Sequence, residues 1–203
     1  FNRFMKIFFR LFISILILGI VGLLAEFIYS IPSHAFNTFR YYTIYGGGDK
    51  CLNKLETYSN DFISLGLLED GKCRVKNAVR ISSFQKTNLS SDLILSCPTA
   101  LKVGEYLNDI GAEHISHMGT YNCRTIAHSK IMSEHSYGTA IDISQIDGAN
   151  VKNDWNKENE KGKVLSTAYK AACKYFYNVI TPDNDKAHFD HFHFDNGYGR
   201  KCF

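Results

Sequence analysis

Histidine and aspartate residues in two short segments of this sequence could bind a metal ion. In the first segment, His135 precedes Asp142 by seven residues. In the second, near the C-terminus, His191 and His193 are separated by one residue. A zinc site that hydrolyses an amide needs about three protein ligands, such as neutral imidazoles and a carboxylate, and an open position for water. We therefore expect His135, Asp142 and His193 to bind Zn²⁺. The alternative is that they are buried, hydrogen-bonded polar groups without a metal.

The remaining histidine of the second segment could transfer protons at such a site. Residues two apart on an extended strand share a face, so His191 would lie beside His193 and be directed into the same pocket. Zinc lowers the pKa of a bound water to about 7, and a nearby base or acid then moves the proton. His191 is therefore a candidate catalytic residue.

The first segment resembles the S-x-H-x-x-G-x-A-x-D signature of the superfamily that contains D-Ala-D-Ala metallopeptidases, lysostaphin and hedgehog proteins. It matches at every fixed position, which are Ser133, His135, Gly138, Ala140 and Asp142. A wider stretch resembles the extensin-like C-terminal domain family within that superfamily, over about residues 50 to 203. It includes Ser96-Cys97-Pro98, Tyr121-Asn122-Cys123-Arg124 and the residues from 188 to 195. With three prolines in 203 residues, the chain has no proline-rich repeat of a plant wall glycoprotein.

That resemblance implies a zinc peptidase that acts on the stem peptides or peptide cross-links of bacterial peptidoglycan. Relatives often carry a tyrosine–arginine segment where this chain has Arg124. Its guanidinium would stabilise a developing oxyanion or bind a substrate carboxylate, because it is permanently charged and bidentate. The alternative for Arg124 is a surface salt bridge.

The resemblance offers two candidates for the general base. In the dipeptidase branch a glutamate lies three residues before the last histidine ligand, and here that position holds Asp190. In the murein endopeptidase branch the first histidine of H-x-H does this work, which here is His191. The spacing of His188, His191 and His193 favours the second branch. We therefore expect His191 to be the base, with Asp190 and His188 assisting or orienting it.

Two non-catalytic functions are alternatives to the peptidase. One is a cell-wall-binding or structural-zinc domain of the same fold that retains the ligands without turnover. The other is a hedgehog-like signalling module with structural zinc. The sequence does not name a protein partner.

The N-terminal residues predict export of the remainder of the chain. Three basic residues precede an uncharged apolar run over residues 11–25, which with residues 26–29 approaches the length of a membrane-spanning helix of about 20 residues. Basic residues before the run place the N-terminus in the cytoplasm and the rest across the membrane. A cleaved signal peptide is the alternative, because Ser33-His34-Ala35 has the form of a cleavage site. We expect an anchor or signal peptide over residues 1–30, a tether over 31–49 and one domain over 50–203.

Charge and cysteine content support an exported domain that does not bind nucleic acid. Beyond residue 35 the chain has 20 basic and 19 acidic residues, because three of its 23 basic and one of its 20 acidic residues come earlier. This balance argues against broad binding of nucleic acid. Six cysteines in an exported domain predict three disulfides, and no C-x-x-C spacing indicates a thiolate zinc site. Of 15 possible connectivities, Cys51 with Cys73 is one plausible pair because both flank a short N-terminal unit.

The apolar pattern predicts an α+β domain in which a small antiparallel sheet, packed with helices, carries the metal site. Helical spacing is found over residues 52–65, after Pro98 as far as Gly111, and over 161–177. Strands are expected at 75–81, 138–144 and 191–195, and residues 114–124 as strand or loop. Asp147-Gly148 is typical of a hairpin turn.

Overall fold

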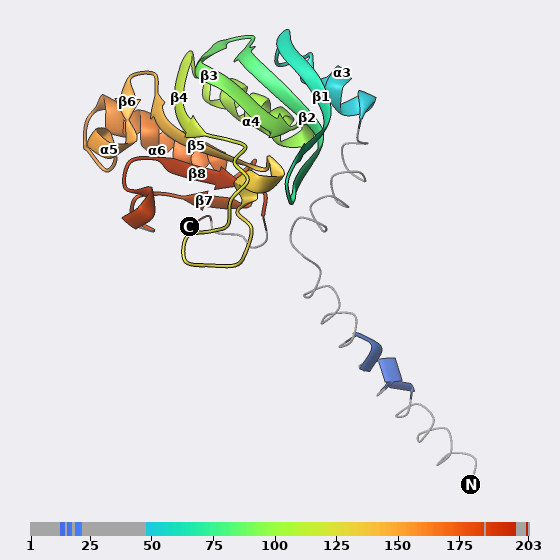
Figure 1. Cartoon of the computed structure of the whole chain (residues 1–203). Coiled ribbons are helices and arrows are strands. Elements are labelled where there is room, and N and C mark those ends of the chain that lie inside the picture. Colours follow the sequence, from blue (N-terminus) through green and yellow to red (C-terminus); the bar gives the residue numbers. More distant parts are fainter. Residues whose placement is uncertain are drawn as a thin grey trace.

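A mixed sheet forms the framework of the protein, and the long helices pack on one side of it (Figure 1). The computed structural model describes residues 13, 14, 16, 17, 19–21, 48–184, 186–197 and 202. In that part of the chain the sheet has eight strands, in the order β1-β2-β3-β4-β5-β8-β7, with β6 paired to β5. The fold is therefore mixed α/β, with a larger sheet than the sequence predicts.

The elements follow one another in an order that explains the direction of the strands. In chain order they are α3 (Asp49–Leu55), β1 (Asp61–Asp70), β2 (Cys73–Phe84), β3 (Thr87–Ser96), α4 (Cys97–Ile110), β4 (His114–Gly119), the 3-10 turn η1 (Glu134–Tyr137), β5 (Ala140–Ile146), β6 (Ala149–Asn150), α5 (Val151–Asp154), α6 (Glu160–Ala172), β7 (Asn178–Ile180), the 3-10 turn η2 (Lys186–His188) and β8 (Phe192–Asp195). Helix α4 connects β3 to β4, so these two strands pair in parallel. The other described pairs are antiparallel. The sequence predicts a small antiparallel sheet that carries the metal site; the strands at the site are antiparallel, whereas the larger sheet is mixed because of this crossover.

Helix α4 begins and ends where the sequence predicts. Pro98 lies in its first turn, where a missing N–H costs nothing. Gly111 caps the C-terminus in the left-handed conformation, with φ of 67°. The apolar face of the helix packs on the sheet, and the ring of Tyr106 makes edge contacts with Phe176 and Phe194.

Strand β5 separates the core from the candidate site. Ile141 and Ile143 are buried in the core. Asp142, between them, points to the opposite face, because successive side chains of a strand alternate. The strand therefore presents a carboxylate on the side that the helices do not cover.

The prediction of one helical segment over residues 52–65 was wrong. The helix α3 ends at Leu55, and Phe62 and Leu65 belong to strand β1. Irregularities in the pairing of β1 with β2 shift the register at three places. As a result the less exposed residues of β1, Phe62, Leu65 and Leu68, recur every three positions instead of every two. Bulges thus produced a spacing that resembles that of a helix.

The prediction of three disulfides is confirmed, whereas the suggested pair is wrong. All six cysteines lie among the described residues and pair as Cys51–Cys97, Cys73–Cys123 and Cys173–Cys202. Cys51 in α3 is bonded to the start of α4. Cys73 is instead bonded to the segment that follows β4.

The predicted membrane anchor and tether fall almost entirely outside the described residues. In the part of the chain that the structure describes, no helix is long and apolar enough to span a bilayer.

Candidate metal centre

Asp142 and His193 face each other across two neighbouring strands. They are direct partners in the register of β5 and β8, and His193 Nδ1 lies 2.8 Å from Asp142 Oδ1. His135 approaches from η1, with its Nε2 3.1 Å from Asp142 Oδ2 and 3.3 Å from His193 Nδ1. One ligand atom from each of the three lies within 4.8 Å of the others. The structure therefore brings together the three residues that the sequence predicts as metal ligands.

The turn that carries His135 is shaped by the residues on either side of it. Ser133 caps η1, and its hydroxyl accepts a hydrogen bond from the backbone N–H of His135. Gly138 ends the turn with φ of 63°. A Cβ at this position would lie 2.9 Å from the backbone nitrogen of Ser96, so only glycine allows the turn to approach β3 so closely. The signature residues Ser133 and Gly138 thus place His135.

Each histidine uses its second ring nitrogen to hydrogen-bond a group behind the site. His135 Nδ1 donates to the backbone carbonyl of Thr120. His193 Nε2 lies 2.9 Å from Asp195 Oδ2. Such partners orient histidines toward metal ions and select their tautomers. Neither group is among the residues predicted from the sequence. Asp195 was detectable, because it lies two residues after His193 on a strand, whereas a backbone carbonyl leaves no signal in a sequence.

The close contacts shift the pKa values of two of the candidate ligands, Asp142 and His193. Burial alone would raise the pKa of Asp142, but hydrogen bonds from His135 and His193 outweigh it and hold that pKa far below its usual value. Burial alone would also lower the pKa of His193. Hydrogen bonds to Asp142 and Asp195 outweigh this, and the pKa rises to about 9. The carboxylates of Asp142 and Asp195 therefore favour the protonated form of the His193 imidazole.

The predicted proton-transfer residues lie next to the ligand atoms. His191 Nε2 is 3.7 Å from Asp142 Oδ1, and His191 Nδ1 is 2.8 Å from Asp190 Oδ1. The ring of His188 lies 5.0 Å from that of His191 and 5.5 Å from that of His193. The structure thus brings His188, Asp190 and His191 to the candidate site, and their roles stay predictions.

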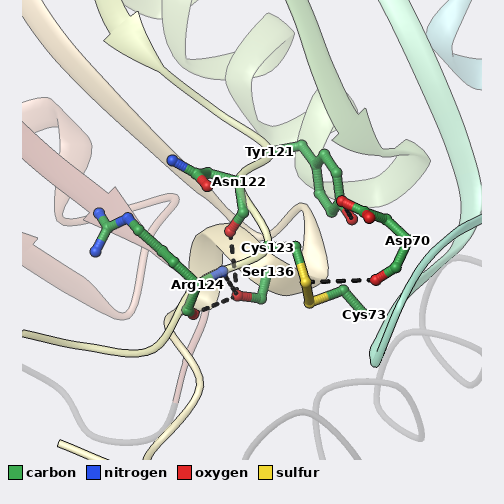
Figure 2. Close-up of a disulfide and its surroundings, with 7 residues drawn as sticks. All are labelled: Asp70, Cys73, Tyr121, Asn122, Cys123, Arg124 and Ser136. Atoms are coloured by element: carbon green, nitrogen blue, oxygen red, sulfur yellow. Dashed lines mark hydrogen bonds between the residues drawn. A yellow bond between two sulfur atoms is a disulfide. The ribbon is translucent and has the colours of Figure 1, made fainter.

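Arg124 is tied to the site through its backbone (Figure 2). Its N–H donates to the hydroxyl of Ser136 at 3.0 Å, and its carbonyl accepts from that hydroxyl at 2.7 Å. The side chain is exposed and extends away from Ser136. With the described residues, its guanidinium forms no hydrogen bond or ion pair, so the alternative of a surface salt bridge gains no support there. The predicted role toward a substrate is untested.

A disulfide and a buried serine connect the turn of His135 to the sheet (Figure 2). Ser136 is fully buried, and its hydroxyl also contacts the carbonyl of Asn122 at 3.1 Å. Cys123, which follows Asn122 in the chain, is bonded to Cys73 of β2. The hydroxyl of Tyr121 donates to Asp70, the last residue of β1. The turn is therefore attached to a segment that is itself cross-linked to β2.

Comparison with known proteins places this site within a family. The family model described as "Extensin-like protein C-terminus" matches residues 49–202, which is more than half of the chain and contains the three candidate ligands. Neither a curated protein nor a solved structure matches the chain. The match over residues 49–202 shows that this chain belongs to the family of extensin-like protein C-termini.

Proposed function

We propose that this protein is a zinc-dependent peptidase that hydrolyses stem peptides or peptide cross-links of bacterial peptidoglycan. The observation that carries the proposal is the convergence of His135 Nε2, the Asp142 carboxylate and His193 Nδ1 within 4.8 Å. The resemblance of residues 133–142 to the metallopeptidase signature supports the choice of reaction and substrate. The three disulfides support a location on the extracytoplasmic side, because disulfides persist in oxidising compartments.

The donor atoms fit zinc. Zn²⁺ accepts imidazole nitrogen and carboxylate oxygen, and three protein ligands leave a fourth position for water or substrate. The second nitrogen of each histidine is already occupied, so both rings direct their remaining nitrogen toward Asp142. Bound zinc would supply Lewis acidity toward an amide carbonyl and would lower the pKa of water.

His191 is suited to take a proton at its Nε2. Asp190 holds the other nitrogen of the ring at 2.8 Å, and a carboxylate accepts, so Nδ1 carries the hydrogen. The lone pair of neutral His191 is then on Nε2, the nitrogen nearest Asp142. Because one oxygen of Asp190 is occupied by His191, this arrangement favours His191 as the base and Asp190 as its orienting partner.

The exposed Arg124 would bind a carboxylate of the substrate. Peptidoglycan stem peptides carry carboxylates, and a guanidinium binds them in a bidentate manner. The backbone of Arg124 is held by Ser136, which fixes the base of the side chain while its end is free to meet a substrate.

Digestion of purified, isotope-labelled peptidoglycan tests the proposal. The oxidised full chain should contain about one zinc and release soluble peptides, identified by mass spectrometry, which would also show the bond that is cut. His193→Ala serves as the control that lacks a ligand and should release none. Zinc binding without release of peptides by the unaltered protein would favour the non-catalytic, wall-binding alternative. Absence of zinc binding would overturn the proposal.

A further inference from the structure

Asp195 lies behind His193, next to the ring nitrogen that does not face Asp142. Both residues belong to β8, and Asp195 Oδ2 lies 2.9 Å from His193 Nε2. The other carboxylate oxygen, Oδ1, accepts hydrogen bonds from the side-chain amide of Asn178 and from the backbone N–H of Gly197, both at 2.7 Å. Asp195 is only 5% exposed, so water has little access to replace these partners.

These hydrogen bonds determine which nitrogen of His193 carries a proton. Two donors converge on Oδ1, and Oδ2 faces His193 Nε2, so the Asp195 carboxylate can accept a hydrogen bond from that nitrogen. The Asp142 carboxylate lies 2.8 Å from Nδ1 and is an acceptor too, so the two carboxylates compete for the hydrogen of a neutral His193 ring. When Asp195 holds that hydrogen on Nε2, the lone pair is on Nδ1 and is available to a metal. We infer that Asp195 is a positioning residue that holds His193 in the tautomer able to bind a metal through Nδ1. This inference rests on the proposed zinc site.

His135 obtains the equivalent control without a side chain. Its Nδ1 donates to the backbone carbonyl of Thr120, which any residue at position 120 would supply. A carbonyl cannot donate, so Nδ1 carries a hydrogen and, when the ring of His135 is neutral, its lone pair is on Nε2. The two histidines thus present different nitrogens to the site, and only the tautomer of His193 depends on a side chain that can be substituted.

Two substitutions of Asp195 separate control of the tautomer from simple support. Asp195→Asn conserves the size of the side chain but replaces one oxygen by an NH₂ group. In one orientation of the amide this group faces His193 Nε2, and in the other it faces the backbone N–H of Gly197, whose direction is fixed. In the first case His193 must carry its proton on Nδ1, and in the second two donors oppose each other. Asp195→Ala removes the acceptor and leaves a cavity, but it places no donor against His193.

The dissociation constant for zinc, measured by competition with a chromophoric chelator, gives the main test on the oxidised full chain. Asp195→Asn should weaken zinc binding by about 10–100-fold, the usual effect of losing the group behind a ligand. It should weaken binding more than Asp195→Ala does, although Asp195→Ala should lower the unfolding midpoint of the metal-free protein more. Asn178→Ala is the matched control, because it removes a partner of Asp195 but leaves the carboxylate on His193, and it should affect zinc less than Asp195→Asn.

The order of the two variants decides the result. If Asp195→Ala is the more damaging for zinc as well as for stability, Asp195 only supports the structure and the inference is overturned. Zinc binding by Asp195→Asn that equals that of the unaltered chain would overturn it as well.

Long-range ¹⁵N NMR of the imidazole rings tests the tautomer without zinc. At a pH where the ring of His193 is neutral, the fraction of rings with the proton on Nε2 should be larger in the unaltered chain than in Asp195→Asn, because the competing Asp142 carboxylate at Nδ1 is the same in both. An equal fraction in the two chains would overturn the inference. The expected tautomer in a chain that binds no zinc would support the inference and count against the proposed function.

Discussion

The two histidines of the candidate metal centre are held by different kinds of structure. His193 belongs to β8, whose backbone pairs with β5 on one side and β7 on the other. His135 lies on η1, a short turn outside the strand ladders, which is held by the hydroxyl of Ser136, the close approach of Gly138 and the Cys73–Cys123 cross-link. We therefore expect the strand side of the site, which is His193 on β8, to tolerate most local changes, whereas the turn side, which is His135 on η1, depends on a few specific contacts.

Removal of a candidate ligand should have the largest effect on zinc content, and this effect should be the same for His193 and for His135. We expect His193→Ala and His135→Ala each to reduce the zinc content far below one per chain, because two remaining ligands do not make a stable site. Elemental analysis of the purified chain measures this. A variant that retains the zinc content of the unaltered protein would remove its residue from the site.

Substitution of His191 should separate catalysis from metal binding within the strand side. His191→Ala should keep the zinc and reduce peptidoglycan turnover by about 10²–10⁴-fold, since a proton carrier is not a ligand. Asp190→Ala should reduce turnover less, by loosening the orientation of the ring. Turnover and zinc content need to be measured together. A larger loss in Asp190→Ala with zinc retained would assign the base to the carboxylate, and loss of zinc in His191→Ala would make His191 a ligand.

Removal of two different disulfides should affect the two sides unequally. Replacement of Cys73 and Cys123 by serine, or of Cys173 and Cys202, should each cost about 2–5 kcal/mol of stability. Only the first pair supports the turn of His135, so we expect only its loss to weaken zinc binding, by about 10-fold. Denaturant unfolding and zinc titration measure the two effects. Equal zinc affinity in both variants would show that the turn does not need the cross-link.

The hydroxyl of Ser136 should have a smaller effect on the same side. Ser136→Ala removes the contacts to Asn122 and Arg124, and we expect zinc affinity to fall by several-fold, up to about 10-fold. Ser129→Ala is the matched control, because among the described residues its hydroxyl has one hydrogen bond, accepted from the N–H of Ile131 at the tip of the same loop. If the two variants bind zinc alike, the turn does not depend on Ser136.

The smallest expected effect is a change in proton uptake on the strand side. In the metal-free protein the pKa of His193 is raised to about 9, from an ordinary value near 6.5. The stabilisation that the protonated ring contributes is therefore fully present below about pH 6.5 and is lost as the pH rises through 9. Zinc must displace this proton, so binding near pH 7.5 should release about one proton, and affinity should increase toward pH 9. Calorimetry in buffers of different ionisation enthalpy measures the release, and zinc binding without it would contradict a protonated His193 in the metal-free protein.

The outcome of the sequence analysis differed between local and distant features. The boundaries of α4 were predictable from Pro98 and Gly111, because capping depends on adjacent residues. Strand β1 was misread as helical, because its bulges depend on the partner strand β2. The three candidate ligands were recognised from a signature, and Asp195 was missed although its position was visible.

The sequence alone indicates which side chains are available for a metal site and which local turns present them. Residue type decides which atoms can bind a metal, and the φ of Gly138 and the alternation of β5 are local properties of the chain. The tertiary structure was needed to show that Asp142 pairs with His193, that Cys73 joins Cys123, and that the carbonyl of Thr120 and the carboxylate of Asp195 contact opposite nitrogens of the two histidines. These contacts join residues that strand register and the crossover bring together. The spacing of neighbouring residues encodes neither the register nor the crossover.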